Sequence, residues 1–221
     1  MRLVNARILG LLLLVVTGVG CASQGLPDVI YLARHGQTEW NRLSRWQGNP
    51  DLDQVGYLNR VSLWQLLKDE PIRAIYTSGK LRTQRTAELL AQQHDLTIKV
   101  RPGLDEISPG IAKGICFSQL APHKAKPSAR RCEVSARGSH PEVALKVLQE
   151  AYLKQEKMGI KGRMPLGESL VDITERSRPV VQELRRGLSK GKILVVAHGV
   201  MNRALLHHLL GWPLKNLAGL R

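Results

Sequence analysis

Two arginines and two histidines in this chain follow directly, or within a few residues, the ends of three short apolar runs. They are Arg34 with His35, Arg82, and His198, which follow residues 28–33 (DVIYLA), 72–76 (IRAIY) and 192–197 (KILVVA) respectively. Guanidinium groups suit the oxygens of a phosphoryl group because they stay charged and offer fixed pairs of donors. A neutral imidazole beside them can attack phosphorus. These residue types predict phosphoryl transfer if the fold brings them together.

The elements that must position these side chains alternate between apolar runs and stretches of helical period. The predicted strands are residues 28–33, 72–76, 96–100 and 192–197, all rich in β-branched side chains. Residues 168–188 predict a helix that an interior Pro179 should bend, and 142–156 predict another with Val143, Val147 and Ala151 on one side. This alternation predicts an α/β protein with three layers, α/β/α, around a mostly parallel sheet. In such sheets the ligand lies at the carboxyl ends of the strands.

Length and composition fit one globular domain. The chain has 221 residues, 43% hydrophobic and 23% charged, which excludes wholesale disorder and a disulfide-dense miniprotein. Its net charge of +15 favours anionic partners, among them nucleic acid, an anionic membrane surface or a phosphorylated small molecule. The candidate site selects the last of these, so we expect a small phosphorylated substrate and no nucleic acid. The sequence makes no prediction of oligomeric state.

The residues around the four candidate side chains resemble the histidine phosphatase superfamily, which includes cofactor-dependent phosphoglycerate mutase and fructose-2,6-bisphosphatase. Residues 34–41 read RHGQTEWN, and the order and spacing of further segments agree with the family up to about residue 214. Those segments are 45–56 (RWQGNPDLDQVG), 78–87 (SGKLRTQRTA), 104–114 (LDEISPGIAKG), 165–172 (PLGESLVD) and 195–205 (VVAHGVMNRAL). The resemblance implies a phosphoglycerate mutase-like fold, and Gln37 with Thr38 fits the mutase-like branch.

The resemblance implies a two-step displacement through a phosphohistidine. His35 would attack phosphorus through an unprotonated ring nitrogen, while its other nitrogen donates to a backbone carbonyl. Glu106 would protonate the leaving oxygen and then, as a carboxylate, activate water. A sister branch of acid phosphatases takes its acid from an Asp just after the second histidine, but Gly199 stands there in this chain. The oxygens of the transferred group would be held by Arg34, Arg82 and His198.

Several secondary roles follow from the same resemblance. Asn41 would line the phosphate pocket, with Gln47 as a further candidate, and the backbone N–H of Gly199 could add a donor at the start of the next helix. Asp105 is the alternative to Glu106 as the acid, because Lys113 replaces a glutamate that often precedes Gly114 in that segment. Neither metal nor cofactor is implied.

The segment 121–137 (APHKAKPSARRCEVSAR) belongs to a basic insertion around 115–140. One interpretation is a cap over the site, in which Arg130 and Arg131 hold a second anionic group of the substrate. The alternatives are a solvated loop and contact with anionic lipid head groups.

The N-terminus predicts a targeting signal. Arg2 and Arg7 precede a 13-residue apolar run, which is shorter than the roughly 20 residues that span a bilayer, so residues 1–20 predict a secretory signal peptide. Cys21 stands where bacterial lipoproteins carry their acylated cysteine, although Gly18 replaces the usual leucine of that motif. The alternative is plain cleavage near Ala22.

This organisation places a short linker at 21–27 and the catalytic domain at 28–221. We therefore expect an exported protein, periplasmic or otherwise extracytoplasmic, that a lipid at Cys21 anchors to a membrane. An oxidising compartment would permit a disulfide between Cys116 and Cys132, with two free thiols as the alternative.

The most favoured function is hydrolysis of phosphate monoesters. The chain ends 23 residues after His198, and in the absence of the tail that shields the phosphoenzyme in mutases we expect water to accept the phosphoryl group. One alternative is a mutase-like phosphotransferase acting on a small metabolite. The other is a catalytically silent lipoprotein that captures an anion, which the presence of both His35 and Glu106 disfavours.

Overall fold

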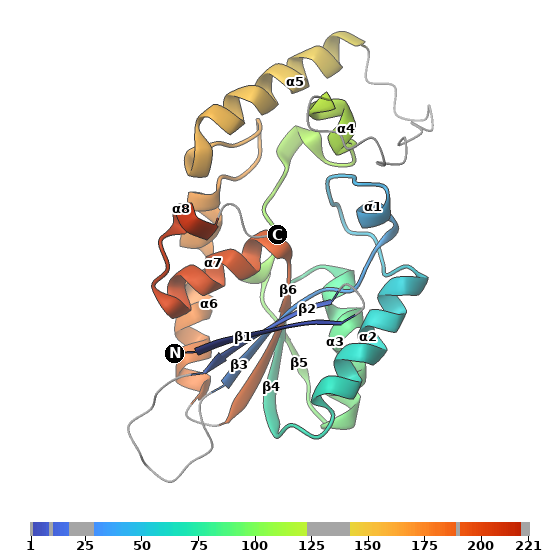
Figure 1. Ribbon diagram of the computed structural model, residues 1–221, viewed down its shortest axis with the longest axis vertical. Helices are drawn as coiled ribbons and strands as arrows, with labels where there is room; N and C mark the ends of the chain where they lie inside the picture. Colours follow the sequence, from blue (N-terminus) through green and yellow to red (C-terminus); the bar gives the residue numbers. More distant parts are fainter. Residues whose placement is uncertain (1, 9–10, 18–28, 123–141, 189–190, 218–221) are drawn as a thin grey trace.

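The computed structural model describes residues 2–8, 11–17, 29–122, 142–188 and 191–217. A central sheet with helices on both sides forms its body, and a smaller group of helices lies beyond one end of the sheet (Figure 1). The strand order is β1-β2-β3-β6-β4-β5. The strands are β1 Arg2–Ile8, β2 Leu11–Thr17, β3 Val29–Arg34, β4 Ile72–Thr77, β5 Ile98–Val100 and β6 Lys192–Ala197.

The four strands expected from the sequence are all present, and they form the parallel part of the sheet. β3 pairs with β6, β6 with β4, and β4 with β5, each in parallel register. The fold prediction, an α/β protein with a mostly parallel sheet, is therefore confirmed. Parallel strands need helical crossovers, which is why each apolar run is followed by a helix before the next strand.

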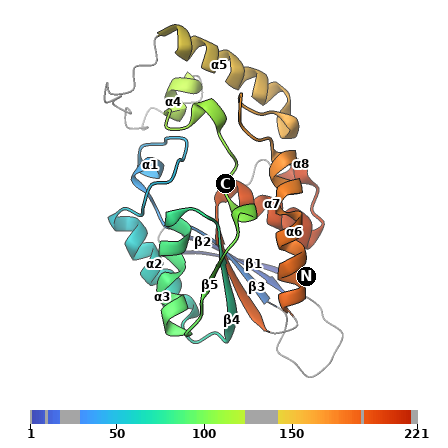
Figure 2. The same cartoon turned by 180° about the vertical axis from the view of Figure 1, so that it is seen from behind.

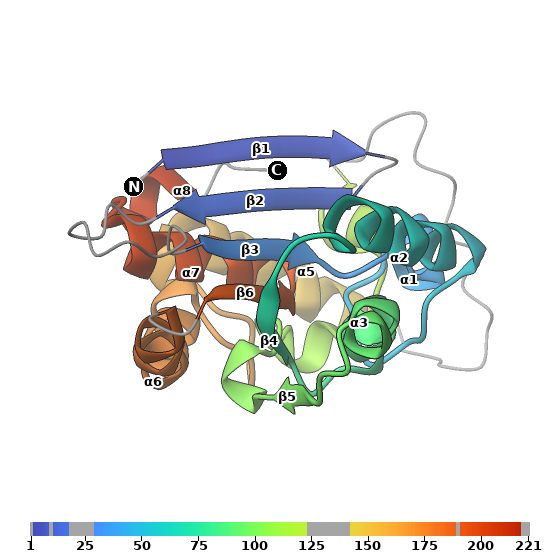
Figure 3. The same cartoon turned by 90° about the horizontal axis from the view of Figure 1, so that it is seen from below.

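Alternate side chains of each strand face opposite helical layers. Ile30 and Leu32 of β3 belong to a buried cluster with residues of α6 and α7, whereas Tyr31 and Ala33 belong to a second cluster with residues of α2 and α3. Figure 3, seen from below, shows α6 and α7 on one face of the sheet and α2 and α3 on the other. Because both faces are buried, the strands read as continuous apolar runs.

The helices follow the expected positions with small shifts at their ends. They are α1 Glu39–Arg42, α2 Gln54–Leu67, α3 Leu81–Gln93, α4 Phe117–Leu120, α5 Glu142–Lys157, α6 Leu170–Leu188, α7 Gly199–Leu210 and α8 Leu214–Leu217, with short 3-10 turns η1 Pro102–Leu104, η2 Gly110–Ala112 and η4 Gly159–Lys161. α6 continues through Pro179, whose side chain is exposed. On this face water can bond the carbonyl that lacks its helical donor. α7 ends at Gly211, whose φ of 70° is left-handed, as C-terminal glycines often are.

A small cap lies beyond the carboxyl ends of the parallel strands. Figures 1 and 2 show α4 and α5 there from opposite sides. Their own apolar cluster includes Leu120, Leu148 and Tyr152. Val147, predicted to share a face with Ala151, is 55% exposed, because the helix buries Leu148 and Tyr152 instead.

The cap is tied to the loop that follows α1. The N–H of Trp46 donates to the carbonyl of Ile115 at 3.0 Å, and the N–H of Phe117 donates to the carbonyl of Ser44 at 2.9 Å. Cys116, which lies between Ile115 and Phe117 in the sequence, is disulfide-bonded. The alternative of a free thiol is therefore wrong for this cysteine. Cys132, its expected partner, and Cys21 lie outside the described residues.

The N-terminal segment forms a hairpin at the edge of the sheet. β1 pairs antiparallel with β2, and β2 pairs antiparallel with β3. Signal-peptide cleavage of residues 1–20 concerns processing of the chain and stays a prediction. Within the described ranges, no helix combines the length and apolar character that crossing a bilayer requires.

Candidate active site

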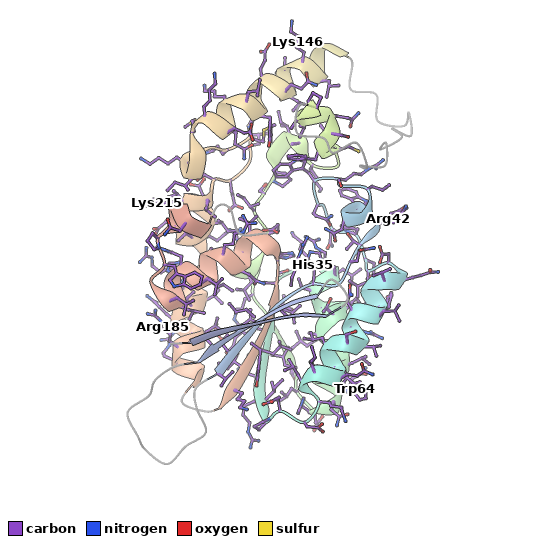
Figure 4. The ribbon with its side chains drawn as sticks, viewed as in Figure 1. His35, Arg42, Trp64, Lys146, Arg185 and Lys215 are labelled. Atoms are coloured by element: carbon purple, nitrogen blue, oxygen red, sulfur yellow. The ribbon has the colours of Figure 1, made fainter. Side chains whose placement is uncertain are left out.

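His35 and His198 lie side by side because the strands that precede them are neighbours in register. Arg34 of β3 pairs with Ala197 of β6, so the next residue of each strand leaves the sheet at the same point. The backbone N–H of His35 still donates to the carbonyl of Ala197 at 3.0 Å. The two imidazole centroids are 5.1 Å apart. Figure 4 shows His35 at the end of the sheet that faces α4 and α5.

The tautomer of His35 is fixed by the backbone of the next residue. Its Nδ1 lies 2.7 Å from the carbonyl oxygen of Gly36, which can only accept, so Nδ1 carries the hydrogen and Nε2 keeps its lone pair. Burial lowers the pKa of His35 well below the usual 6.5, and the charges of Arg82 and Arg34 lower it further. The imidazole is therefore neutral at neutral pH, as a nucleophile must be.

The backbone at this point passes close to α2. A Cβ on Gly36 would lie 2.6 Å from the carbonyl oxygen of Gly56, and one on Gly56 would lie 2.1 Å from the carbonyl oxygen of Gln37. The N–H of Gly36 donates to the hydroxyl of Thr86 at 2.9 Å. Two glycines in contact thus let the turn after β3 sit against α2 and hold His35 in place.

His198 has the opposite tautomer. Its Nδ1 lies 3.2 Å from Nη2 of Arg82, which can only donate, so Nδ1 accepts and Nε2 donates to the hydroxyl of Ser78 at 2.8 Å. Burial, then the neighbouring His35 and Arg82, lower the pKa of His198 well below 6.5. The second imidazole is also neutral, and Arg82 and Ser78 together hold its plane.

Arg82 is fully buried and reaches across the site from the first turn of α3. Nη1 donates to the carbonyl of Gly48 at 2.9 Å, while Nη2 faces His198. Burial lowers its pKa to about 10, which leaves the guanidinium protonated at neutral pH. Its Nε is buried without a hydrogen-bond partner, so one donor of this cation is still unused. Arg34, at the end of β3, is exposed, with its Nε 3.8 Å from the Cβ position of Gly199.

A buried threonine orients the two amides expected in the phosphate pocket. The Thr38 hydroxyl lies 3.0 Å from Oδ1 of Asn41 and 3.2 Å from Oε1 of Gln47, and it also accepts from the N–H of Asn41 as the N-cap of α1. With the amide oxygens facing Thr38, the NH₂ groups are turned away from it. An anion accepts hydrogen bonds, and in an amide side chain the NH₂ group is the donor.

The two acidic candidates occupy different positions. Glu106 accepts hydrogen bonds from three backbone N–H groups, those of Ile107 at 3.0 Å and of Met201 and Val200 at 3.2 and 3.4 Å. It therefore lies at the N-terminus of α7, the helix that His198 begins. Asp105 is committed to the turn before α3, since it accepts from the N–H of Gly79 at 2.7 Å and pairs with Lys80 at 2.8 Å. Glu106 thus lies beside the helix that follows His198, whereas Asp105 is held in the turn that precedes α3.

Two cavities meet at Glu106. One, of about 230 Å³, is lined by polar side chains that include Arg34, Asn41 and Glu106 and by the aromatic rings of Trp46 and Phe117. The second, of about 360 Å³, is lined by Arg82 and Glu106 and by Lys80 and Lys113. Gln47 borders both. Glu106 thus lines both cavities, the first together with Arg34 and the second together with Arg82.

The structure brings most of the expected residues together and shows two that the sequence reasoning missed. His35, Arg34, Arg82, His198, Glu106, Asn41, Gln47 and Gly199 gather at one edge of the sheet. Arg130, Arg131 and Cys21 lie outside the described residues. The missed residues are Thr38 and Ser78. Thr38 contacts the side-chain amides of Asn41 and Gln47, and Ser78 is hydrogen-bonded to His198. Thr38 had a usable signal, because Thr-x-x-Asn is a helix-capping spacing. For Ser78, the usable signal was its position just after a predicted strand.

Comparison with known proteins adds to this geometry. The family model for the histidine phosphatase superfamily (branch 1) matches residues 30–143 and 134–221. A probable phosphoglycerate mutase GpmB from Yersinia pestis (strain Pestoides F) is 29% identical over 187 residues, which cover 83% of this chain and 75% of that protein.

Solved structures of similar shape include phosphatases. A mycobacterial glucosyl-3-phosphoglycerate phosphatase in complex with VO3 superimposes with a TM-score of 0.65 at 26% identity, covering 86% of this chain and 85% of that one. A putative alpha-ribazole-5'-P phosphatase from Escherichia coli superimposes with a TM-score of 0.65 at 21% identity, covering 85% of this chain and 82% of that one, and this likeness shows a shared fold.

Proposed function

The chain belongs to the histidine phosphatase superfamily (branch 1), and from this premise we propose that it hydrolyses phosphate monoesters through a phosphohistidine on His35. The observation that carries the proposal is the hydrogen bond from Nδ1 of His35 to the carbonyl of Gly36. It leaves Nε2 with a lone pair, in a buried site beside Arg82 and Arg34. A cationic pocket with a neutral imidazole is suited to attack on an anionic phosphorus centre.

In the first step, Nε2 of His35 attacks phosphorus in line with the bond to the leaving oxygen. The N–P bond forms as the P–O bond breaks, and the protonated carboxyl of Glu106 gives its proton to the leaving oxygen. Products are an alcohol, the Glu106 carboxylate and a phosphohistidine. The Nδ1–H bond to Gly36 persists through the step, so the positive charge on the modified ring faces a carbonyl dipole.

In the second step, water attacks the same phosphorus atom from the side that the alcohol has left. The Glu106 carboxylate accepts a proton from that water, the P–N bond breaks, and its electron pair returns to Nε2 of His35. Inorganic phosphate leaves, and Glu106 holds the proton that the next substrate needs. Both steps use one carboxyl group, so the site balances protons without a metal.

The surrounding donors stabilise the charge that spreads over the three equatorial oxygens. Arg82, fixed by Gly48 and His198, and Arg34, at the end of β3, supply the positive charge. The NH₂ groups of Asn41 and Gln47, whose amide oxygens face Thr38, add neutral donors. Such donors are already oriented before the reaction starts, which is the main advantage of a folded site over water.

The experiment uses the full chain with 4-nitrophenyl phosphate in the presence of a chelator. We expect turnover that His35→Ala abolishes, and a radiolabelled phosphoenzyme, stable in alkali, that the same variant lacks. His207→Ala, on the last turn of α7, is the matched control and should keep its activity. Full turnover by His35→Ala would exclude this residue as the nucleophile.

Transfer to another substrate molecule is the second candidate, because a relative at 29% identity is named a probable phosphoglycerate mutase. The two reactions share the first step and differ in the acceptor of the phosphoryl group. Phosphoglycerate incubated with the protein should release inorganic phosphate if water is the acceptor. Isomerised phosphoglycerate without phosphate release would favour transfer.

We also propose that the protein is exported and anchored through Cys21. β3 begins at Val29 and ends at Arg34, beside His35. A tether attached before Val29 therefore joins the sheet at the amino end of β3, at the opposite end of the strand from the site. It leaves the pocket open to solvent. Removal of residues 1–20 would take β1 and β2 away and leave β3 at the edge of a parallel four-stranded sheet.

A further inference from the structure

The loop that carries Glu106 is held by a salt bridge from a different part of the chain. Arg176, in α6, pairs with Glu168, which lies just before that helix. Nε of Arg176 donates to Oε1 of Glu168 at 2.8 Å, and Nη2 donates to Oε2 at 3.0 Å. Both side chains are about three-quarters buried, with exposures of 26% and 25%. This two-point geometry is the strong form of an arginine–carboxylate pair.

The same guanidinium also binds the backbone on the N-terminal side of Glu106. Nη1 and Nη2 of Arg176 donate to four carbonyl oxygens, those of Gly103 at 3.0 Å, Asp105 at 3.1 Å, Pro102 at 3.4 Å and Glu106 at 3.4 Å. A single planar cation therefore spans five successive residues of the loop, including the acid itself. Lysine offers one compact ammonium and lacks this reach.

Glu168 binds the backbone on the C-terminal side of Glu106. Its Oε2 accepts from the N–H of Ser108 at 2.9 Å, and its own N–H donates to the carbonyl of Ser108 at 2.9 Å. Burial tends to raise the pKa of Glu168, but the hydrogen bonds from Arg176 and Ser108 outweigh it and hold the pKa below its usual value. The carboxylate is thus charged. Together, Arg176 and Glu168 hold the backbone on both sides of Glu106 in the sequence.

We propose that Glu168 and Arg176 are positioning residues for the acid of the proposed hydrolysis, on which this inference rests. By fixing residues 102–108, the pair sets the carboxyl of Glu106 at the N-terminus of α7, where Glu106 lines both cavities. Proton transfer depends steeply on the placement of the acid relative to the leaving oxygen. A loop that moves by about 1 Å would therefore slow the proton transfer while leaving His35 and its cations in place.

The test separates proton donation from the rest of the reaction. A dinitrophenyl leaving group departs as a stable anion and needs no proton, whereas the alkoxide of glycerol phosphate does. The variants are Arg176→Lys and Glu168→Gln. Arg178→Lys is the control on the same helix, since Arg178 makes an exposed pair with Glu175. The value of kcat/KM is compared for both substrates, because it reports phosphoryl transfer to His35 before the second step begins.

We expect kcat/KM for glycerol phosphate to fall about 10- to 100-fold in both variants, a fraction of what general acids contribute. For dinitrophenyl phosphate we expect kcat/KM of these variants to change by less than about 3-fold. In the control Arg178→Lys we expect no loss that is confined to glycerol phosphate.

Equal losses with both substrates would overturn the proposal, because they would mean a general structural role or a direct contact with substrate. Unchanged activity with both would overturn it too. If Arg176→Lys fails to fold, as judged by circular dichroism, Glu168→Gln still gives the comparison. Failure of the proposed function itself is recognised separately, since the wild-type protein would then form no phosphohistidine with either substrate.

Discussion

The two buried imidazoles make a quantitative prediction about stability and pH. The pKa values of His35 and His198 in the folded protein lie well below the 6.5 of an exposed histidine, chiefly because both rings are buried. In the unfolded chain both titrate normally. As the pH falls below about 6.5, the unfolded state therefore binds two protons that the folded state does not, and the free energy of unfolding decreases.

The size of the effect follows from the ordinary pKa of 6.5 in the unfolded chain and from rings that stay neutral in the folded protein. Between pH 7.5 and 5.5, a histidine that titrates at 6.5 when unfolded and stays neutral when folded costs about 1.4 kcal/mol of stability. The pair costs about 2.7 kcal/mol. Carboxyl groups with lowered pKa values, such as Glu168 and Asp172, lose their contribution at lower pH, below their unfolded values of 4.5 and 3.8. This pH window therefore isolates histidines.

The measurement is urea unfolding at several pH values for the wild type and for His35→Gln with His198→Gln. The double variant has its own stability at pH 7.5, but its decrease toward pH 5.5 should be smaller than that of the wild type by about 2.7 kcal/mol. His208, whose burial also lowers its pKa, contributes equally to both proteins and cancels. Val147→Gln, an exposed substitution on α5, should keep the wild-type slope. Equal slopes for the wild type and the double variant would refute the assignment of two neutral, buried imidazoles.

Two further predictions test the site and the maturation of the chain. Arg82→Lys should lower kcat/KM about 100-fold, because an ammonium cannot reach both Gly48 and His198, and it should destabilise the fold by about 1–3 kcal/mol by leaving a buried acceptor unpaired. Kinetics and urea unfolding check this, and activity within about 3-fold of wild type would show that the guanidinium geometry is unnecessary. Export should yield a mature protein that begins at Cys21 and carries acyl chains. Intact mass and N-terminal sequencing read this directly, and an unmodified chain that begins at Met1 in the membrane fraction would contradict it.

Some features were predictable from the sequence because they depend on residues that are close along the chain. The four parallel strands follow from short β-branched runs, and each places its polar residues at the same edge because parallel strands share a direction. His35 and His198 could thus be placed together from residue order alone. The hairpin of β1 and β2 was not predicted, because the same apolar run satisfies the pattern of a signal peptide.

Other features depend on contacts between distant segments, which no local pattern encodes. The sequence by itself indicated the chemistry that we propose, since residue types and their positions at strand ends predict a phosphoryl pocket with an imidazole nucleophile. Only the tertiary structure decided which nitrogen of each imidazole carries the hydrogen, because Gly36 and Arg82 set opposite tautomers. It also showed that Asp105 is held in a turn by Gly79 and Lys80, and that Glu168, the first residue of the helix predicted over 168–188, pairs with Arg176. Side chains at such separations acquire their roles only when packing brings their partners within hydrogen-bonding distance.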